Sequence, residues 1–296
     1  MPNLLDMTDL PMTVIIMKLD YKSILTLRKV CHSLRNSIDA AAGFKTDLDN
    51  IDIYIGPTGF SVTCNWLNGI SANDWTSNDL KVILKMAKNK LSRFSVITNP
   101  DNVGGLDDFE EILKNQTRPI KTERFKIGGS GILQILPYLH PKYLKEISIK
   151  NYDADDQNLG IEQLLELEQF QNTLDLHIDH CYSVHAPLRK FFHFQTLSVN
   201  LHGISLEDLV ALKEAFVTST HMESFGLNGD GLNEVQLEQV FGTPFDDPFY
   251  ELGGPLWFFK IQSCKEHVLK IEWMLDSVRF CKLKAEEVPR NAVVQD

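Results

Sequence analysis

A strand pattern that recurs through the second half of the sequence limits the possible folds of this chain more than any other feature. The pattern is L-x-x-I-x-I in one-letter code. It occurs at Leu144-Ile147-Ile149, Phe194-Leu197-Val199 and Met222-Phe225-Leu227, with a looser copy at Leu174-Leu176-Ile178. Because successive side chains of a strand point to opposite faces, this alternation predicts strands with one buried face and one wet face.

Helical segments separate these strands, at about residues 160–170 and 205–218, where Ser205 and Asp208 make a capping pair. Corresponding strands are roughly 22 to 31 residues apart. A unit of one strand and one helix cannot bury its apolar face alone, so such units stack into a continuous core and a curved sheet. The spacing is close to the leucine-rich-repeat layout.

The fold class predicted from these features is α/β, with a leucine-rich-repeat-like strand–helix array and a curved sheet that is open on one face. A layered α/β domain is the competing fold. A doubly wound sheet, however, would need strands that are apolar on both faces.

The alternation of helix and strand extends upstream to about residue 77. The spacing of Leu80, Ile83, Leu84, Ala87 and Leu91 predicts a helix that starts at a capping pair of Thr76 and Asp79. Further helices are predicted around Phe109–Leu113 and Ile132–Leu136, and strands around Phe94–Val96 and Phe125–Ile127. Gly104-Gly105 and Gly128–Gly131 indicate turns, and Trp257–Phe259 indicates the core of a late strand.

An open sheet face would carry the residues that lie between the buried apolar ones. The predicted rows are Lys126, Ser148, His177 and Ser198; Glu146, Asp175, Thr196 and Ser224; and Lys150, Asp179, Asn200 and Asn228. The candidate target-binding residues among them are Lys126, Glu146, Ser148, Lys150, Asp175, His177, Asp179, Ser198 and Asn200. The alternative is a plain solvated sheet, with targets held by loops.

The first forty residues predict a small helical unit that is unusually apolar. Residues 14–17 and Leu19 are apolar on every side of the first helix, Asp20 marks a turn, and Ile24, Leu27, Cys31 and Leu34 follow at helical spacing. So short a unit cannot bury this much apolar surface by itself. Two explanations stay open: the helices pack on the following domain, or they bind a partner protein.

The run "LDYKSILTLRKVCHSLRN", which begins at Leu19, resembles the second half of an F-box, in particular that of the nematode proteins that join an F-box to an FTH domain. The family's opening is an apolar residue followed by Pro. An ungapped register places Met7-Thr8 there, and Leu10-Pro11 has the matching chemistry three residues later. The resemblance implies binding to a Skp-type adaptor and, through it, to a cullin. The implied adaptor-binding residues are Leu10, Pro11, Ile15, Ile16, Leu19, Leu25 and Val30.

The stretches "IEQLLELEQFQNTLDLHI" and "HFQTLSVNLHGISLEDLVALKEAF" and the tail "PLWFFKIQ…VLKIEWMLDSVRFCKL" resemble the FTH pattern. The resemblance implies an F-box in residues 1–45 and an FTH domain in 46–296 that recruits an unknown target protein. The expected function is therefore that of a non-catalytic, substrate-recruiting subunit of a Skp–cullin–F-box ubiquitin ligase. A scaffold that binds proteins without degrading them is the alternative.

Composition argues against several other classes of protein. The net charge of −11 opposes binding to nucleic acid. The five scattered cysteines indicate free thiols in a reducing compartment, and residues 1–20 show no signal peptide. No apolar run is long enough to span a membrane. Cytoplasm or nucleus is the expected location, with no membrane partner and no cofactor.

Motifs for metal, phosphate or nucleophile chemistry are weak. His177, His180, Cys181 and His185 are the densest group of metal-type ligands. This stretch runs out of a predicted strand, however, and alternate side chains of a strand point to opposite faces, so no metal site is predicted. Gly128–Gly131 lacks the phosphate-loop spacing. No local arrangement activates a nucleophile, so no catalytic residue is predicted.

Overall fold

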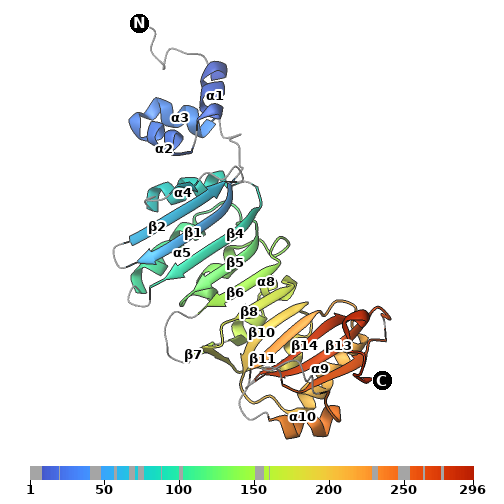
Figure 1. The fold of residues 1–296 in the computed structure, drawn as a ribbon. Helices are drawn as coiled ribbons and strands as arrows, with labels where there is room; N and C mark the ends of the chain where they lie inside the picture. The colour runs from blue at the N-terminus through green and yellow to red at the C-terminus, as the bar shows by residue number, and fades with distance from the viewer. Residues whose placement is uncertain are drawn as a thin grey trace. The chain divides into compact units, whose positions relative to one another are not determined.

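The computed structural model describes residues 9–19, 21–40, 48–56, 59–66, 71–72, 77–87, 89–99, 103–150, 157–159, 161–228, 233–245, 254–262, 264–274 and 277–296. These residues form two units. Unit 1 is Met1–Glu123 with Tyr138–Tyr143, and unit 2 is Arg124–Pro137 with Leu144–Asp296. Figure 1 shows an N-terminal helical region followed by a mostly sheet body, so the coarse prediction of a mixed α/β chain is confirmed.

The predicted N-terminal helical unit consists of α1 (Asp9–Lys18), α2 (Tyr21–Val30) and α3 (His32–Ala40). Its apolar residues meet in a small core of Met12, Ile16, Ile24, Leu34 and Ile38, each at most 6% exposed. The turn predicted at Asp20 falls on a residue outside the described ones. Helices this short depend on such packing, because they are marginal in isolation.

Unit 1 also holds a sheet in the order β4-β1-β2-β3. Strand β1 (Leu48–Gly56) pairs antiparallel with β2 (Gly59–Trp66), which pairs with β3 (Ser71–Ala72), and β1 pairs parallel with β4 (Leu91–Thr98). The helices of this region are α4 (Ser77–Met86) and α5 (Val103–Lys114). Sequence reasoning assigned no strand before residue 94, although Ile51, Ile53 and Ile55 alternate clearly and are all buried.

Two predictions in this region were wrong. Leu91 continues the helical spacing from Leu80 but begins β4, where its backbone N–H donates to Lys121 O. Gly104 and Gly105 lie inside α5 and not in a turn. The buried positions Leu106, Phe109 and Leu113 hold that helix in place despite the glycines. Thr76, the predicted cap of α4, lies outside the described residues.

Unit 2 contains a run of parallel strands in the order β5-β6-β8-β10-β11. The strands are β5 (Thr122–Gly128), β6 (Glu146–Lys150), β8 (Asp175–Ile178), β10 (Thr196–Leu201) and β11 (Ser224–Asn228). Short strands β7 (Gln157–Leu159) and β9 (Tyr182–Val184) pair with each other, and β9 also pairs with β10.

Helices connect these strands. They are α6 (Ile132–Ile135), α7 (Ile161–Leu165), α8 (Glu168–Asn172), α9 (Leu206–Thr218) and α10 (Glu234–Phe241), with 3-10 helices at Leu136–Tyr138, Leu188–Phe191 and Ala285–Glu287. Ser205 and Asp208 form the predicted capping box at the start of α9. Gly129 and Gly131 have φ of 85° and 96°, so the glycine run is the predicted strand-to-helix turn.

The core of unit 2 is a row of apolar side chains that face the helices. Phe125, Ile147, Leu176, Leu197 and Phe225 are consecutive partners across the parallel strands, and none is more than 1% exposed. Phe216 of α9 covers the end of the row, with its ring centroid 5.3 Å from that of Phe225. Burial of one such side chain stabilises the fold by about 1.5–3 kcal/mol.

An antiparallel hairpin ends the parallel run. Strand β14 (Ser277–Lys284) pairs antiparallel with β11 and with β13 (His267–Met274), which pairs antiparallel with β12 (Leu256–Lys260). The last strand, β15 (Val294–Gln295), lies parallel to β12 at the edge. A second small core of Leu256, Phe258 and Val268 forms beneath C-terminal residues that include Val288, Ala292 and Val294. Trp257 and Phe259 are buried in β12, as predicted.

Candidate functional site

The N-terminal helices keep apolar side chains in contact with solvent. Val14 on α1 is 47% exposed, and Val30 at the end of α2 is 65% exposed. Pro11 is also exposed, and Ile15 and Leu19 are half-buried. These apolar side chains are accessible to a protein partner.

The predicted adaptor-binding residues differ in how exposed they are. Ile16 is 1% exposed and belongs to the core of the helical unit, so it supports the surface and does not form it. Leu10 lies in α1 and Leu25 in α2, and their side chains are outside the described set. Val14 was not in the predicted set. Sequence alone could not place it, because which side of an all-apolar helix is covered depends on its neighbours.

An ion pair joins the helical unit to the next helix of unit 1. Lys29 Nζ lies 3.1 Å from Asp79 Oδ1 at the start of α4, and the Asp79 side chain is 8% exposed. This contact is polar. Val14 and Val30 keep their exposure in its presence, so among the described side chains this contact leaves both valines uncovered.

The strands of unit 2 place the predicted polar residues in rows. Lys126 pairs with Ser148, Ser148 with His177, and His177 with Ser198. The second row runs from Glu146 through Asp175 and Thr196 to Ser224. In the third row Asn200 pairs with Asn228, Lys150 is the last residue of β6, and Asp179 directly follows β8. We call the surface made by these rows the polar face.

The polar face extends past the predicted residues. Arg124 pairs with Glu146, and Gly226 pairs with both Ser198 and Arg279. Sequence reasoning missed Arg279, because Arg279 joins this row only through the antiparallel pairing of β14 with β11. The face is thus basic on β5, carries carboxylates on β6 and β8, has small neutral side chains on β10 and β11, and becomes basic again at Arg279.

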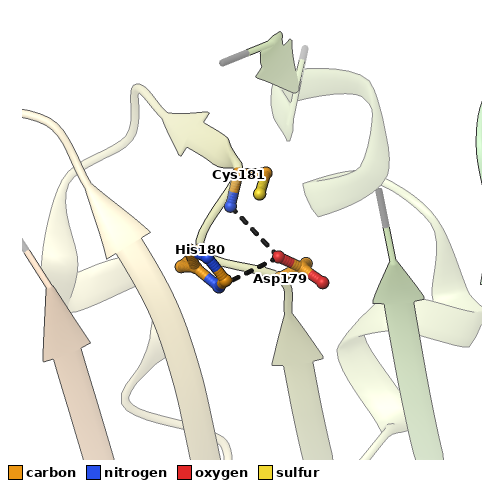
Figure 2. Close-up of side chains that lie close together, drawn as sticks. All are labelled: Asp179, His180 and Cys181. Atoms are coloured by element: carbon orange, nitrogen blue, oxygen red, sulfur yellow. Dashed lines mark hydrogen bonds and ion pairs between the residues drawn. The ribbon is translucent and has the colours of Figure 1, made fainter. Parts of the chain in front are cut away.

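Potential metal ligands gather at the edge where β8 ends. Asp179, His180 and Cys181 follow β8 directly, and their ligand atoms all lie within 4.8 Å of one another. In Figure 2 the His180 ring and the Cys181 backbone N–H both point at the Asp179 carboxylate, at 3.1 Å and 3.2 Å from its Oδ1. The strand ends at Ile178, so the alternation used to separate these side chains does not apply to them.

His177 and His185 do not join this group. His177 lies in a central row of the polar face, and the ring centroid of His185 lies 4.6 Å from that of His202, which follows β10. This histidine pair borders a cavity of about 320 Å³ together with Asp208.

A larger cavity of about 630 Å³ has Cys264, His267 and Cys281 in its lining. Cys264 Sγ lies 3.4 Å from His267 Nδ1. Burial raises the pKa of the Cys281 thiol, an effect that Lys270 partly opposes, so this sulfur favours the protonated form.

Among the described helices, none combines the length and the apolarity needed to cross a bilayer.

Comparison with known protein families gives two matches that fit this geometry. The F-box domain model matches residues 4–41, which include the helical unit, and the FTH domain model matches residues 105–245, which include the parallel strands. The chain therefore contains an F-box domain and an FTH domain. The F-box thus carries the exposed valines, and the FTH match contains every predicted target-binding residue.

A curated relative is also named as an F-box protein. The chain is 23% identical over 261 residues to F-box A protein 224 of Caenorhabditis elegans. The alignment covers 75% of this chain and 65% of the relative, so the chain spans about two thirds of that protein's length. No solved structure matches the chain.

Proposed function

We propose that this F-box protein is a substrate-recruiting subunit of a Skp–cullin–F-box ubiquitin ligase. In this function the F-box binds a Skp-type adaptor and, through it, a cullin, while the FTH region holds a target protein. The chain acts by position, because a target that is held near the ubiquitin-carrying enzyme reacts at a high effective concentration. No catalytic residue, cofactor, nucleic acid or membrane is part of the proposal, and the site of action is cytoplasmic or nuclear.

The observation that carries the proposal is the exposure of Val14 and Val30 on helices that match the F-box domain. Ile16, Ile24 and Ile38 fill the core between the helices, so the unit has a folded interior and still presents apolar side chains to a partner. An adaptor that covers them removes apolar surface from water, which is the main favourable contribution in most protein association.

For the target, the proposal uses the polar face. Its side chains stand on strands whose opposite surface is the core, so a bound protein meets a firmly held set of charges and hydrogen-bonding groups. We take the F-box as residues 1–45 and the target-binding part as 46–296. We also interpret the parallel strands and their helices as a leucine-rich-repeat-like array, which offers one open sheet face to a partner.

Adaptor binding is tested with matched valine substitutions. Val30→Asp and Val14→Asp place a carboxylate in the proposed interface, and each should weaken co-purification with a Skp-type adaptor by about tenfold or more, which corresponds to about 1.4 kcal/mol. Val235→Asp is the control, because Val235 is 64% exposed on α10 of unit 2. Ile16→Ala should lower the stability of the F-box through its core.

Wild-type protein that fails to bind the adaptor would refute the ligase function. The protein would then be better described as a scaffold that binds other proteins without degrading them. Equal loss of adaptor binding in Val30→Asp and Val235→Asp would contradict the assignment of the interface to the F-box helices.

Target binding is tested by blocking the polar face. Ser198→Arg places a long cation in the middle of a row, and Gln239→Arg makes the same charge change on exposed α10. Proximity labelling in cells should lose a set of partners with Ser198→Arg and keep them with Gln239→Arg. Identical partner sets for both variants and the wild type would exclude the central row of the polar face.

A further inference from the structure

The residues that follow β8 have the composition of a transition-metal site. Asp179 offers a carboxylate oxygen, His180 an imidazole nitrogen and Cys181 a thiol sulfur. Thiolate and imidazole together favour zinc among the common divalent ions, and carboxylate is also a zinc ligand. From this cluster we propose that Asp179, His180 and Cys181 bind one Zn²⁺ ion.

The distances are compatible with such a site. In tetrahedral zinc sites with bonds of about 2.0–2.3 Å, ligand atoms lie roughly 3.4 Å apart. Asp179 Oδ1 and His180 Nδ1 are already 3.1 Å apart, and all three ligand atoms lie within 4.8 Å. His180 is 77% exposed, so its ring turns without disturbing the core. Small rotations of the side chains are therefore enough to bring the ligands together.

The backbone that carries these ligands is held from several directions. Asp179 N–H donates to Ile149 O of β6 at 2.9 Å, and Tyr182 N–H donates to Asp179 O at 3.0 Å. Asn200 Nδ2 of β10 donates to His180 O at 3.1 Å, and the Tyr182 hydroxyl donates to Gly129 O at 3.1 Å. A turn fixed to neighbouring strands keeps its ligands close to the geometry needed for binding before the ion arrives.

The ion would have three protein ligands and a fourth position for water, as in open zinc sites. Binding displaces the thiol proton of Cys181 to solvent, so sulfur coordinates as a thiolate. It also replaces the present interaction of His180 with Asp179. Lys150 ends the neighbouring strand, but its side chain is exposed, so solvent and salt screen its charge from the ion.

The test uses the protein with all 296 residues, reduced with a phosphine, and adds Zn²⁺ or the spectroscopic substitute Co²⁺. We expect one equivalent of Co²⁺ to give a sulfur-to-cobalt charge-transfer absorption, which excess Zn²⁺ removes. Cys181→Ser should abolish this absorption. His180→Ala and Asp179→Asn should weaken binding by at least about tenfold, the lower limit found even for outer partners of metal ligands.

Two controls separate this site from other thiols and histidines. Cys264→Ser removes the thiol that lies beside His267, and His185→Ala with His202→Ala removes the neighbouring histidine pair. Both proteins should keep the absorption. Absence of one-equivalent binding in the wild type, retention of the absorption in Cys181→Ser, or its loss only in a control would overturn the assignment. Adaptor binding enters none of these measurements, so the zinc site and the ligase function fail independently.

Discussion

At the scale of single residues, the loss of contact with water shifts the pKa of one cysteine and one histidine. Cys64 on β2 is 0% exposed, and burial, with the charge of Asp52 as a smaller cause, raises the pKa of its thiol to about 12. His193 is exposed at the surface but packs against Phe194 with ring centroids 4.0 Å apart, and this partial desolvation lowers the pKa of its imidazole, although hydrogen bonds with backbone groups of Phe170 and Lys190 oppose the effect.

Cys64 should be inert to thiol reagents in the folded protein. Thiolate is the reactive species, and a thiol with a pKa of about 12 provides almost none near neutral pH. Maleimide labelling followed by peptide mass spectrometry should leave Cys64 unmodified while the half-buried Cys181 reacts. Labelling in denaturant is the control and should modify both. Rapid native labelling of Cys64 would contradict its burial on β2, which lies between β1 and β3.

His193 should make the fold less stable in mild acid. Its pKa in the folded protein is below the ordinary value of 6.5, so the unfolded chain takes up the proton first as pH falls. The stability that neutral His193 contributes is therefore complete above about pH 6.5 and declines as pH falls towards the lower folded pKa. NMR titration should give a His193 pKa below 6.5.

The variant His193→Asn tests the same effect through stability. Asparagine does not titrate, so its melting temperature should fall less than that of the wild type between about pH 7.5 and about pH 5.5. Parallel decreases in the two proteins would assign the acid sensitivity to other groups.

At the scale of helices and strands, the local patterns were reliable where one face was buried and one was wet. The row from Lys126 to Ser198 followed directly from the alternation of apolar and polar residues in β5, β6, β8 and β10. Leu91 was misplaced because helical spacing and the start of a strand are indistinguishable in a short apolar run. The hairpin of β1 and β2 had a detectable signal in Ile51, Ile53 and Ile55, with Gly56 and Gly59 beside its turn.

The candidate site, too, could be predicted only where the residues that form it are positioned by local patterns. Pairing within the parallel run is local and regular, so it can be extrapolated from strand to strand. Arg279 joins the polar face through an antiparallel strand whose register no local pattern sets. Val14 and Ile16 are both apolar residues of α1, and the packing of α2 and α3 decides that one is exposed and the other buried.

The start of α9 provides a prediction for a single helix. Ser205 Oγ accepts from Asp208 N at 3.1 Å, and Asp208 Oδ2 accepts from Ser205 N at 3.2 Å. Ser205→Ala removes the cap of a helix whose Phe216 covers β11, so it should lower the free energy of unfolding by about 1 kcal/mol. Ser198→Ala on the polar face is the control, and urea denaturation measures both. Equal stability of the two variants would contradict a role for the cap.

At the scale of the whole molecule, the two proposed binding surfaces belong to different units. The F-box lies in unit 1, and the polar face lies in unit 2. Their interiors are also different: α1 to α3 surround a few aliphatic side chains, whereas unit 2 has a continuous core rich in phenylalanine. The F-box should therefore be the less stable part in the absence of a partner.

Hydrogen exchange should show this difference. Adaptor binding should slow amide exchange in α1, α2 and α3, because ligand binding stabilises the state that it recognises. Exchange in β8, β10 and β11 should stay unchanged, since those strands are protected by their own core. Slower exchange in unit 2 and not in the F-box would show that the adaptor binds unit 2, which would contradict the proposed interface.

The C-terminal strands have a consequence for what can pair with this edge of the sheet. Beyond the parallel strands, β14 reverses direction, and the outermost β15 is two residues long and lies beside the ion pair of Lys260 and Asp296. An edge this short and charged offers almost no template for another strand. Strand addition by another protein or by a second copy of this chain is therefore disfavoured at this edge, which limits edge-to-edge aggregation there.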